Sequence, residues 1–320
     1  MTRIAKDISK AIEVLNAEDV VAIPTETVYG LAGNIYSEKA IKKIFDLKRR
    51  PLFNPLIVHL DSIEHMEEIV SHVPDKAKRL AKAFWPGSLT LILPKKDTVP
   101  DLVTAGKDTV AVRIPKHPVT LELLQRLDFP LAAPSANPFG SISPTSPLHV
   151  EYYFGDKLSM VLDGGDCENG IESTIIGFEN GKPVLYRLGS IAMEDIINVI
   201  GEIEVKNKKE NAPNAPGMLS RHYAPNTTTF LVDDVEAFID NKLDKKIGAL
   251  LFHKKVDNPN LAHQEVLSSS GSLKEATSKL YATLHKMDKL DLDMIVAERF
   301  PDTGLGKSIN DRLERATKKA

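Results

Sequence analysis

The segment spanning residues 23–60 constrains the fold of this chain more than any other stretch: IPTETVYGLAGNIYSEKAIKKIFDLKRRPLFNPLIVHL. It begins at the end of a short apolar run, residues 20–23, whose length suits a buried strand. Apolar residues at helical spacing then predict a helix that ends near Leu47, and Pro51 prevents its continuation. Residues 56–60 are apolar again and predict a second strand. The order of strand, helix and strand indicates an α/β fold.

Two polar features of this segment indicate a binding site. Thr25 and Thr27 follow the first strand directly, and Lys48, Arg49 and Arg50 lie where the helix ends. Cations at a helix C-terminus also offset the helix dipole, so this cluster alone favours a structural role by about three to one. Because loops at strand ends carry the sites of α/β proteins, we nevertheless predict that the segment binds an anion such as a nucleotide.

A hydroxyl-rich loop and two cations in strand-like runs add to this prediction. Residues 134–147 read PSANPFGSISPTSP, and a packed core does not require so many hydroxyls. The polar candidates in this loop are Ser135, Asn137 and Ser143. Arg113 and Arg187 lie inside β-type runs, where a charge without a partner would be costly. Their partners could be a bound anion or neighbouring carboxylates, and the residues alone allow both.

Fingerprints of metal sites and of common nucleotide sites are absent from the sequence. There is no H-E-x-x-H or G-x-G-x-x-G pattern, so no metal-ligating residue is predicted. Gly306-Lys307-Ser308 resembles the end of a P-loop, but Pro301 stands where the motif needs glycine. A helix start is therefore favoured there by roughly nine to one. His59 lies in an apolar strand, where a structural histidine is favoured by roughly two to one.

The length and composition fit a globular protein of two domains. A chain of 320 residues can bury two cores, and 42% hydrophobic with 27% charged residues is ordinary. Residues 201–226 begin with a polar, proline-containing stretch that has no periodicity and indicates a linker. Strand-like runs before it include residues 89–93, 110–114, 131–133, 173–176 and 184–187. Beyond it, strands at 229–232, 247–252 and 294–297 alternate with helical patterns. We therefore predict domains at residues 1–200 and 227–320, the second one small and mostly parallel.

Charge and cysteine content exclude several classes of protein. The net charge of −3 argues against a surface built entirely for nucleic acid. The single cysteine, Cys167, forms no internal disulfide and cannot supply a cysteine-based zinc site. The N-terminus is an amphipathic helix pattern without an apolar signal core, and the apolar runs are too short to span a bilayer. We expect a cytoplasmic protein without a membrane partner.

Several motifs together resemble the YrdC-like family of threonylcarbamoyl-AMP synthases: PTETVYGLAGN, KRRPLFNPLIVH and APSANPFGSISPT. APGMLSRHYAP and SINDRLERA resemble the longer, two-domain form, although Leu219-Ser220 departs from the family pattern of an aromatic before the basic residue and histidine. The resemblance implies a YrdC-like twisted mixed sheet with flanking helices in residues 1–200. It also implies a smaller Rossmann-like α/β domain at 227–320, with the linker at 201–226 as an active-site lid.

The resemblance further implies an activity and its partners. The enzyme would be a nucleotidyltransferase that converts L-threonine, bicarbonate and ATP into threonylcarbamoyl-AMP and pyrophosphate. Mg²⁺ would accompany ATP, and the product would feed threonylcarbamoyladenosine modification of tRNA. A downstream tRNA threonylcarbamoyl transferase is the implied protein partner, and tRNA itself is a candidate for direct contact.

The resemblance assigns roles to particular residues of this chain. The catalytic set would be Lys48, Arg50, Ser135 and Asn137. ATP would contact Arg50, Asn54, Thr109, Ser135, Ser143, Arg187 and Tyr223. Threonine would be held by Thr27, His59, Arg113 and Ser173, with Arg113 paired to its carboxylate. On this basis Arg50→Ala is expected to remove most turnover and leave the melting temperature almost unchanged, because the partner of Arg50 would be substrate.

Three alternatives compete with this reading. A non-catalytic module that binds tRNA or double-stranded RNA would need a broad basic face, which the net charge of −3 disfavours. A carbamoyltransferase of the hydrogenase-maturation type shares the domain but carries zinc-finger cysteines, whereas this chain has one cysteine. In the third alternative, the protein is a two-domain α/β protein whose cations are all structural.

Overall fold

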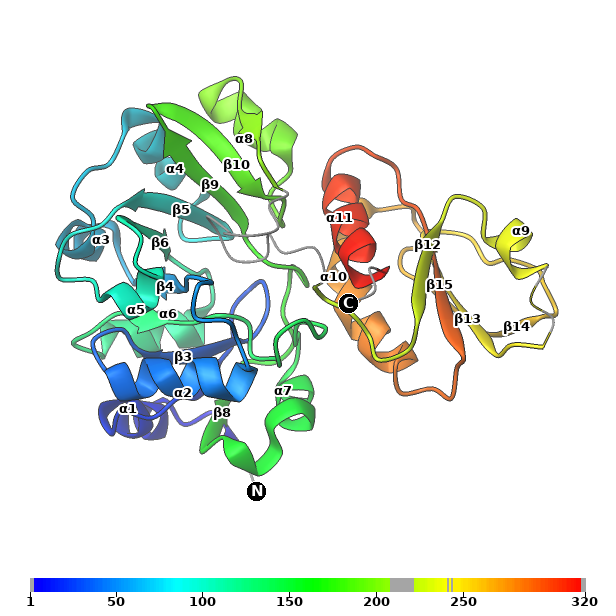
Figure 1. Ribbon diagram of the computed structural model, residues 1–320, viewed down its shortest axis with the longest axis horizontal. Helices are drawn as coiled ribbons and strands as arrows, with labels where there is room; N and C mark the ends of the chain where they lie inside the picture. The colour runs from blue at the N-terminus through cyan, green and yellow to red at the C-terminus, as the bar shows by residue number, and fades with distance from the viewer. Residues whose placement is uncertain (1–2, 208–221, 241, 243, 318–320) are drawn as a thin grey trace.

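The computed structural model describes residues 3–207, 222–240, 242 and 244–317. Figure 1 shows two bodies, each built around its own sheet, with helices α10 and α11 of the smaller body lying between the two sheets. Most of the predicted linker, including Leu219-Ser220, falls outside the described residues. Within the described ranges, no helix is both long and apolar enough to cross a membrane.

The larger sheet has 11 strands, with parallel and antiparallel neighbours in the order β1-β8-β2-β3-β7-β4-β6-β5-β9-β10-β11. Its strands are β1 (Arg3–Ala5), β2 (Val21–Ile23), β3 (Gly30–Asn34), β4 (Ile57–His59), β5 (Leu89–Pro94), β6 (Thr109–Arg113), β7 (Leu131–Ala132), β8 (Met160–Leu162), β9 (Thr174–Glu179), β10 (Lys182–Arg187) and β11 (Glu204–Val205). The mixed α/β fold implied by the resemblance is therefore confirmed.

Eight α-helices and one 3₁₀ turn accompany this sheet in the described residues. They are α1 (Ile8–Asn16), α2 (Glu38–Lys48), α3 (Ile63–Ile69), α4 (Asp75–Phe84), α5 (Asp101–Thr104), α6 (Pro118–Gln125), α7 (Pro147–Phe154), η1 (Gly155–Lys157) and α8 (Met193–Ile200). The main core lies between helices such as α2 and the sheet, and one buried cluster contains Ile41 and Ile44 of α2 together with Leu31 and Val58 of the sheet.

The smaller sheet is wholly parallel, with four strands in the order β12-β15-β13-β14. Its strands are β12 (Thr229–Val232), β13 (Ile247–Leu251), β14 (Leu261–Val266) and β15 (Met294–Glu298). Its helices are α9 (Val235–Ile239), α10 (Leu273–Met287) and α11 (Leu305–Thr317). The predicted small, mostly parallel α/β domain is confirmed, and Gly306 lies at a helix start as expected.

Helix α2 shows how the local sequence places the cations of the first segment. The Ser37 side chain accepts from the Ala40 backbone N–H at 3.1 Å and caps the helix start. At the other end Arg49 adopts a left-handed conformation with φ of 50°, which ends the helix. This turn leaves Arg49 exposed while Lys48 and Arg50 are both buried.

The structure differs from the sequence expectations at several strands. Residues 30–34, for which the sequence predicted no strand, form β3, and Ile4 lies in strand β1 ahead of helix α1 rather than in the helix. Residues 204–205, assigned to the linker, form edge strand β11 beside β10. The two glycines of β3 hide the strand pattern, because glycine is uncommon in strands. Gly33 lets helix α2 approach the strand closely, since an added Cβ there would lie 3.2 Å from Ala40 Cβ.

The two domains share one apolar core at their interface. Val28, Ile142 and Ile171 of the larger domain pack in the same cluster as Leu280 and Ile309 of the smaller one. The larger domain contributes loop residues here rather than the face of its sheet. The small domain therefore covers the loops that surround the candidate site.

Candidate active site

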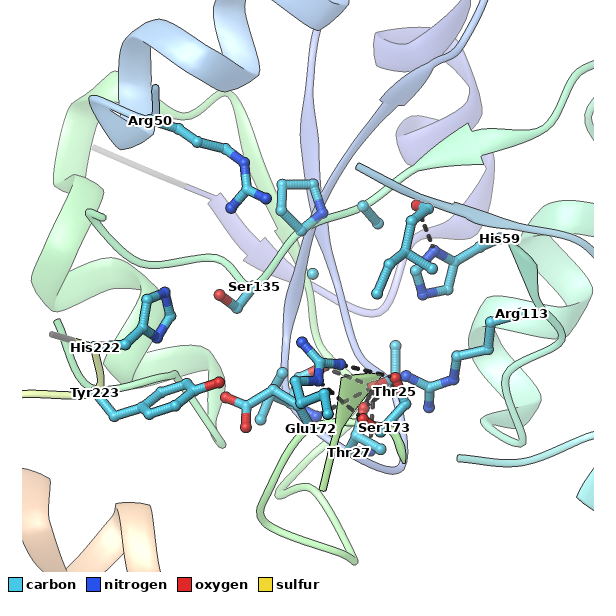
Figure 2. A pocket seen from close by; sticks show the side chains of 16 residues that line it. Thr25, Thr27, Arg50, His59, Arg113, Ser135, Glu172, Ser173, His222 and Tyr223 are labelled. Atoms are coloured by element: carbon cyan, nitrogen blue, oxygen red, sulfur yellow. Dashed lines mark hydrogen bonds between the residues drawn. The ribbon is translucent and has the colours of Figure 1, made fainter. Parts of the chain in front are cut away.

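A cavity opens where loops of the larger domain meet the end of the linker (Figure 2). Its lining comprises Thr25, Thr27, Val28, Gly30, Arg50, Ile57, His59, Arg113, Ala133, Pro134, Ser135, Glu172, Ser173, Arg187, His222 and Tyr223. The segment at residues 23–60 supplies lining residues from both of its ends, since Thr27 follows β2 and His59 ends β4. His59 and Arg113 are direct neighbours on adjacent parallel strands.

Most of the sequence-predicted site residues meet in this cavity. Those in its lining are Thr27, Arg50, His59, Arg113, Ser135, Ser173, Arg187 and Tyr223. Four others are hydrogen-bonded to lining residues: Lys48, Asn54, Asn137 and Ser143. Thr109 is placed differently, because it begins β6 while Arg113 ends it, and it lines a second cavity with Phe178 and Tyr186.

Arg113 is buried and already has a carboxylate beside it. Its Nη2 forms an ion pair with Glu26 Oε1 at 2.6 Å, while Nη1 donates to Thr27 Oγ1 at 2.9 Å. Nε donates to the Gly87 carbonyl at 3.1 Å. Of the two partners that the sequence allowed for this cation, the described residues therefore provide the carboxylate. Glu26 also accepts from the Lys116 backbone N–H, so its position is fixed.

Ser173, the residue directly before β9, holds the side chain of Arg187. Its hydroxyl lies 2.7 Å from Thr90 Oγ1 and 3.0 Å from Arg187 Nη2, which donates to it. Arg187 Nε donates to the Ser173 carbonyl, also at 3.0 Å. The guanidinium of Arg187 is thus held against the edge of the cavity, and burial lowers its pKa.

His59 is a neutral imidazole in this environment. Burial, followed by the nearby Arg113 cation, lowers the pKa of His59 to about 3. Its Nδ1 lies 3.3 Å from the Ile57 carbonyl, which orients the ring within the strand. His59 therefore combines a packed position with a place in the lining, so the structural and functional readings are compatible.

Arg50 stabilises its own turn. Nε donates to the Asn54 carbonyl at 3.1 Å, and Nη2 donates to Asn54 Oδ1 and the Pro55 carbonyl, each at 2.7 Å. Burial and the neighbouring Arg187 lower the pKa of Arg50 to about 9, so it is still a cation at neutral pH. Two buried guanidinium groups close enough to affect each other favour an anion between them.

Lys48 fixes the hydroxyl-rich loop from behind. Its Nζ donates to the Ser135 and Asn137 carbonyls at 2.5 and 2.6 Å, and it lies outside the cavity lining. Burial, then the charge of Arg50, lowers the pKa of Lys48 well below its usual range. Asn137 in turn donates from Nδ2 to the Ser141 carbonyl at 2.9 Å. These bonds present Ser135 to the cavity.

Sequence reasoning missed three groups at the site: Glu26, Glu172 and His222. Glu172 lines the cavity as a buried carboxylate, and Ser143 donates to it at 2.6 Å. Burial, then the cations Lys48 and Arg50, lowers the pKa of His222 well below its usual range. His222 and Glu26 stand inside motifs that carried the resemblance, whereas Glu172 lies in a run without periodicity.

Two family models match the chain. One, described as Telomere recombination and covering Sua5, YciO and YrdC proteins, matches residues 13–189. The other, described as Threonylcarbamoyl-AMP synthase, C-terminal domain, matches residues 191–317.

Curated relatives match over nearly the whole length. Threonylcarbamoyl-AMP synthase of Pyrococcus abyssi is 40% identical over 306 residues, which cover 93% of this chain and 90% of the relative. That of Bacillus subtilis is 39% identical over 319 residues, covering 97% and 92%.

Solved structures agree with these matches. The crystal structure of P. abyssi Sua5 complexed with L-threonine is 38% identical, with a TM-score of 0.91, covering 99% of this chain and 98% of that one. E. coli YciO, at 22% identity and a TM-score of 0.52 over 59% of this chain and 96% of its own, shares the fold of the larger domain. The chain therefore belongs to the Sua5/YrdC family, in the two-domain form of the threonylcarbamoyl-AMP synthases.

Proposed function

We propose that this synthase acts as a nucleotidyltransferase on L-threonine, bicarbonate and ATP in the cavity described above. The observation that carries the proposal is the placement of two sets of groups around one cavity. Figure 2 shows Arg113, Thr27 and Ser173 on one side and Arg50, Ser135 and Tyr223 on the other. The first set suits a small amino acid with a carboxylate, and the second suits phosphate.

The reaction requires positioning and charge neutralisation more than covalent help from the protein. The threonine amine and bicarbonate combine, with loss of water, into an N-carboxylate. An oxygen of this carboxylate attacks the α-phosphorus, a new P–O bond forms, and the bond to pyrophosphate breaks. Arg50 and Arg187 would offset the charge that develops on the leaving pyrophosphate. Lys48 would act indirectly, through the loop that presents Ser135.

In the threonine subsite, Arg113 would bind the substrate carboxylate while Glu26 holds the guanidinium in place. Thr27 and Ser173 would complete this subsite with hydroxyl groups, and the neutral imidazole of His59 would add no charge. Asn54, Ser143 and Thr109 would contact ATP, Thr109 from the far end of β6.

The described residues fit Mg²⁺ only as an ion carried by the nucleotide. Glu172 lines the cavity as a carboxylate, but its oxygens already accept from Ser143 and Tyr281. No group of three or more histidine, cysteine, aspartate or glutamate side chains in the described ranges could hold a metal ion. Mg²⁺ would therefore be held by triphosphate oxygens and water, and would supply further charge neutralisation.

We further propose that the end of the linker closes the cavity as a lid. The Ala224 backbone N–H donates to the Gly140 carbonyl at 2.8 Å, which ties this segment to the hydroxyl-rich loop. Tyr223, one residue earlier, is buried and lines the cavity. A lid would protect a hydrolysable carbamate and adenylate from water. The product would then pass to the transferase that modifies tRNA in the cytoplasm.

Labelled ATP, threonine and bicarbonate provide the test. Pyrophosphate release that requires both threonine and bicarbonate is expected, together with a threonine-containing adenylate. A folded protein that releases no pyrophosphate but binds RNA with a steep salt dependence would favour the binding-module alternative.

A further inference from the structure

Glu172 is held mainly by the other domain. The Tyr281 hydroxyl lies 3.1 Å from its Oε1 and 3.0 Å from its Oε2, and Arg312 Nε donates to Oε2 at 3.2 Å. Tyr281 belongs to α10 and Arg312 to α11, so both come from the small domain. Both side chains are buried, with Arg312 only 1% exposed. The carboxylate in the cavity wall therefore depends on groups more than 100 residues away in the sequence.

A carboxylate in the wall of an anion-binding cavity is costly unless its charge is paired. It repels the substrate, and its own burial is unfavourable without partners. Arg312 supplies the opposite charge, and its Nη1 also lies 3.0 Å from Asp311 Oδ2. The small domain thus neutralises Glu172, which would otherwise oppose the binding of an anion.

The same two side chains also contact Tyr223. The Arg312 guanidinium lies 5.2 Å from the centre of the Tyr223 ring, and the Tyr281 ring is stacked at 5.7 Å from it. Ser143 donates to the same Glu172 carboxylate, and Ser173 is the next residue along the chain. Tyr281 and Arg312 therefore support several cavity groups without lining the cavity themselves.

We propose that Arg312 and Tyr281 are positioning residues of the active site. Through them the small domain sets the positions of Glu172, Ser143 and Tyr223 that substrate binding and synthesis require. The inference rests on the proposed function for its kinetic consequence, because Ser143 and Tyr223 are expected to contact ATP and Ser173, next to Glu172, is expected to contact threonine. A purely structural role would instead affect the stability of the domain interface alone.

Tyr281→Phe is the most direct variant, because it removes the hydroxyl and keeps the ring. Lys307→Gln is its matched control: Lys307 Nζ donates to Glu194 Oε1 at 2.8 Å, which also joins the two domains but lies outside the cavity. We expect Tyr281→Phe to lower kcat/KM for ATP by about tenfold, the cost of losing a hydrogen bond to a charged group. Lys307→Gln should keep the activity of the unaltered chain.

A double-mutant cycle separates positioning from stability. Glu172→Gln and Tyr281→Phe act through the same hydrogen bonds, so the double variant should lose little more kcat/KM than the more impaired single variant. Arg312→Lys keeps the charge and should retain more activity than Arg312→Met. Multiplicative losses in the cycle, or a Tyr281→Phe variant as active as Lys307→Gln, would overturn the inference.

Binding of threonine, measured by calorimetry on the same variants, keeps this inference distinct from the proposed function. If the unaltered chain releases no threonine-dependent pyrophosphate, the proposed function fails and the binding data decide the inference. Weaker threonine binding by Tyr281→Phe than by Lys307→Gln supports positioning through Glu172 and Ser173. Equal affinities in that case overturn it.

Discussion

Arg50 donates to three oxygen atoms of the turn that follows it, in Asn54 and Pro55. If substrate were the partner of this cation, as the resemblance implies, Arg50→Ala would leave the melting temperature almost unchanged. The three hydrogen bonds of Arg50 to its own turn revise this prediction for stability but not for activity. Arg50→Ala should still lower kcat/KM by about a hundredfold or more. It should also lose about 1–3 kcal/mol of unfolding free energy, because buried carbonyls lose their donor.

Arg49→Ala is the matched control for this prediction, since Arg49 is the exposed neighbour of the same cation run. Steady-state kinetics and urea unfolding of both variants test it. The account is contradicted if Arg50→Ala retains activity, or if Arg49→Ala is equally impaired.

Tyr223 carries a buried hydroxyl that has no hydrogen-bond partner among the described residues. Because nothing in the described protein would be lost with it, Tyr223→Phe should leave the unfolding free energy unchanged within about 0.5 kcal/mol. If ATP is the partner, kcat/KM for ATP should fall by about tenfold. Tyr29→Phe should behave in the opposite way, since that hydroxyl donates to the Gly165 carbonyl at 2.7 Å. Thermal melts combined with ATP titrations distinguish the two patterns.

The place of Glu172 in the site could not be predicted from the sequence. Thr27, Arg50 and Ser135 were identified because motifs of contiguous residues carry them, and the structure brings them to one cavity. Glu172 lies in an aperiodic run, and its partners Tyr281 and Arg312 are 109 and 140 residues away. No local pattern encodes that contact, because it forms only when the two domains pack together.

At the scale of elements, helix α7 and helix α10 meet through two stacked imidazoles, His149 and His285, with ring centres 3.9 Å apart. Burial, then the neighbouring imidazole, lowers the pKa of His149 to about 3, while burial lowers that of His285 to about 4. Lys289 adds to both shifts. His285 Nε2 also lies 3.1 Å from the Ser143 carbonyl, which joins this pair to the hydroxyl-rich loop.

These histidines should make stability depend on pH in one direction. In the unfolded chain they bind protons below about pH 6.5, whereas the folded protein keeps His285 neutral until about pH 4. Stability is therefore present above pH 6.5 and is lost as the pH falls from 6.5 towards 4. His285→Gln should reduce this loss by up to about 1.4 kcal/mol per pH unit. Urea unfolding at pH 7 and pH 5 measures it.

The exposed His65 provides the control for that measurement, because it pairs with Asp61 and its pKa is raised. Because a raised pKa favours the folded state as the pH falls, His65→Gln should not reduce the loss of stability on acidification. Identical pH dependence of the unaltered chain and His285→Gln would refute the assignment.

Helices and strands could be predicted from the sequence where their apolar residues recur with a clear period. They could not be predicted where glycines interrupt the apolar pattern or where the strand is very short. Strand β13 follows a clear apolar pattern, and the strands predicted at residues 173–176 and 184–187 correspond to β9 and β10. Strand β3 contains two glycines and was missed, although Gly33 allows helix α2 to approach closely. Two-residue strand β11 has no pattern of its own, since pairing with β10 defines it.

At the scale of the whole molecule, the backbones of the two domains approach each other closely at Gly170. Its φ is +72°, and an added Cβ would lie 2.3 Å from the Ser278 carbonyl oxygen in α10. Gly170→Ala should therefore push the domains apart, with a loss of about 1–3 kcal/mol beyond the cost of the backbone conformation. Because Glu172 lies two residues away, activity should fall as well.

Gly165→Ala is the matched control, because Gly165 also has a positive φ of +79° but no atom within 4 Å of an added Cβ. It should lose only the backbone cost of about 1 kcal/mol and keep its activity. Limited proteolysis between the domains and thermal melts compare the two variants. Equal behaviour would show that the domain contact is not tight at this position.

The central claim is that one cavity joins threonine, bicarbonate and ATP, and pyrophosphate release tests it most directly. The purified full-length chain is incubated with labelled ATP, and threonine and bicarbonate are omitted in turn. The account predicts release only when both are present, with one threonylcarbamoyl-adenylate formed for each pyrophosphate. Release that is independent of threonine, or none from the folded protein, would contradict it.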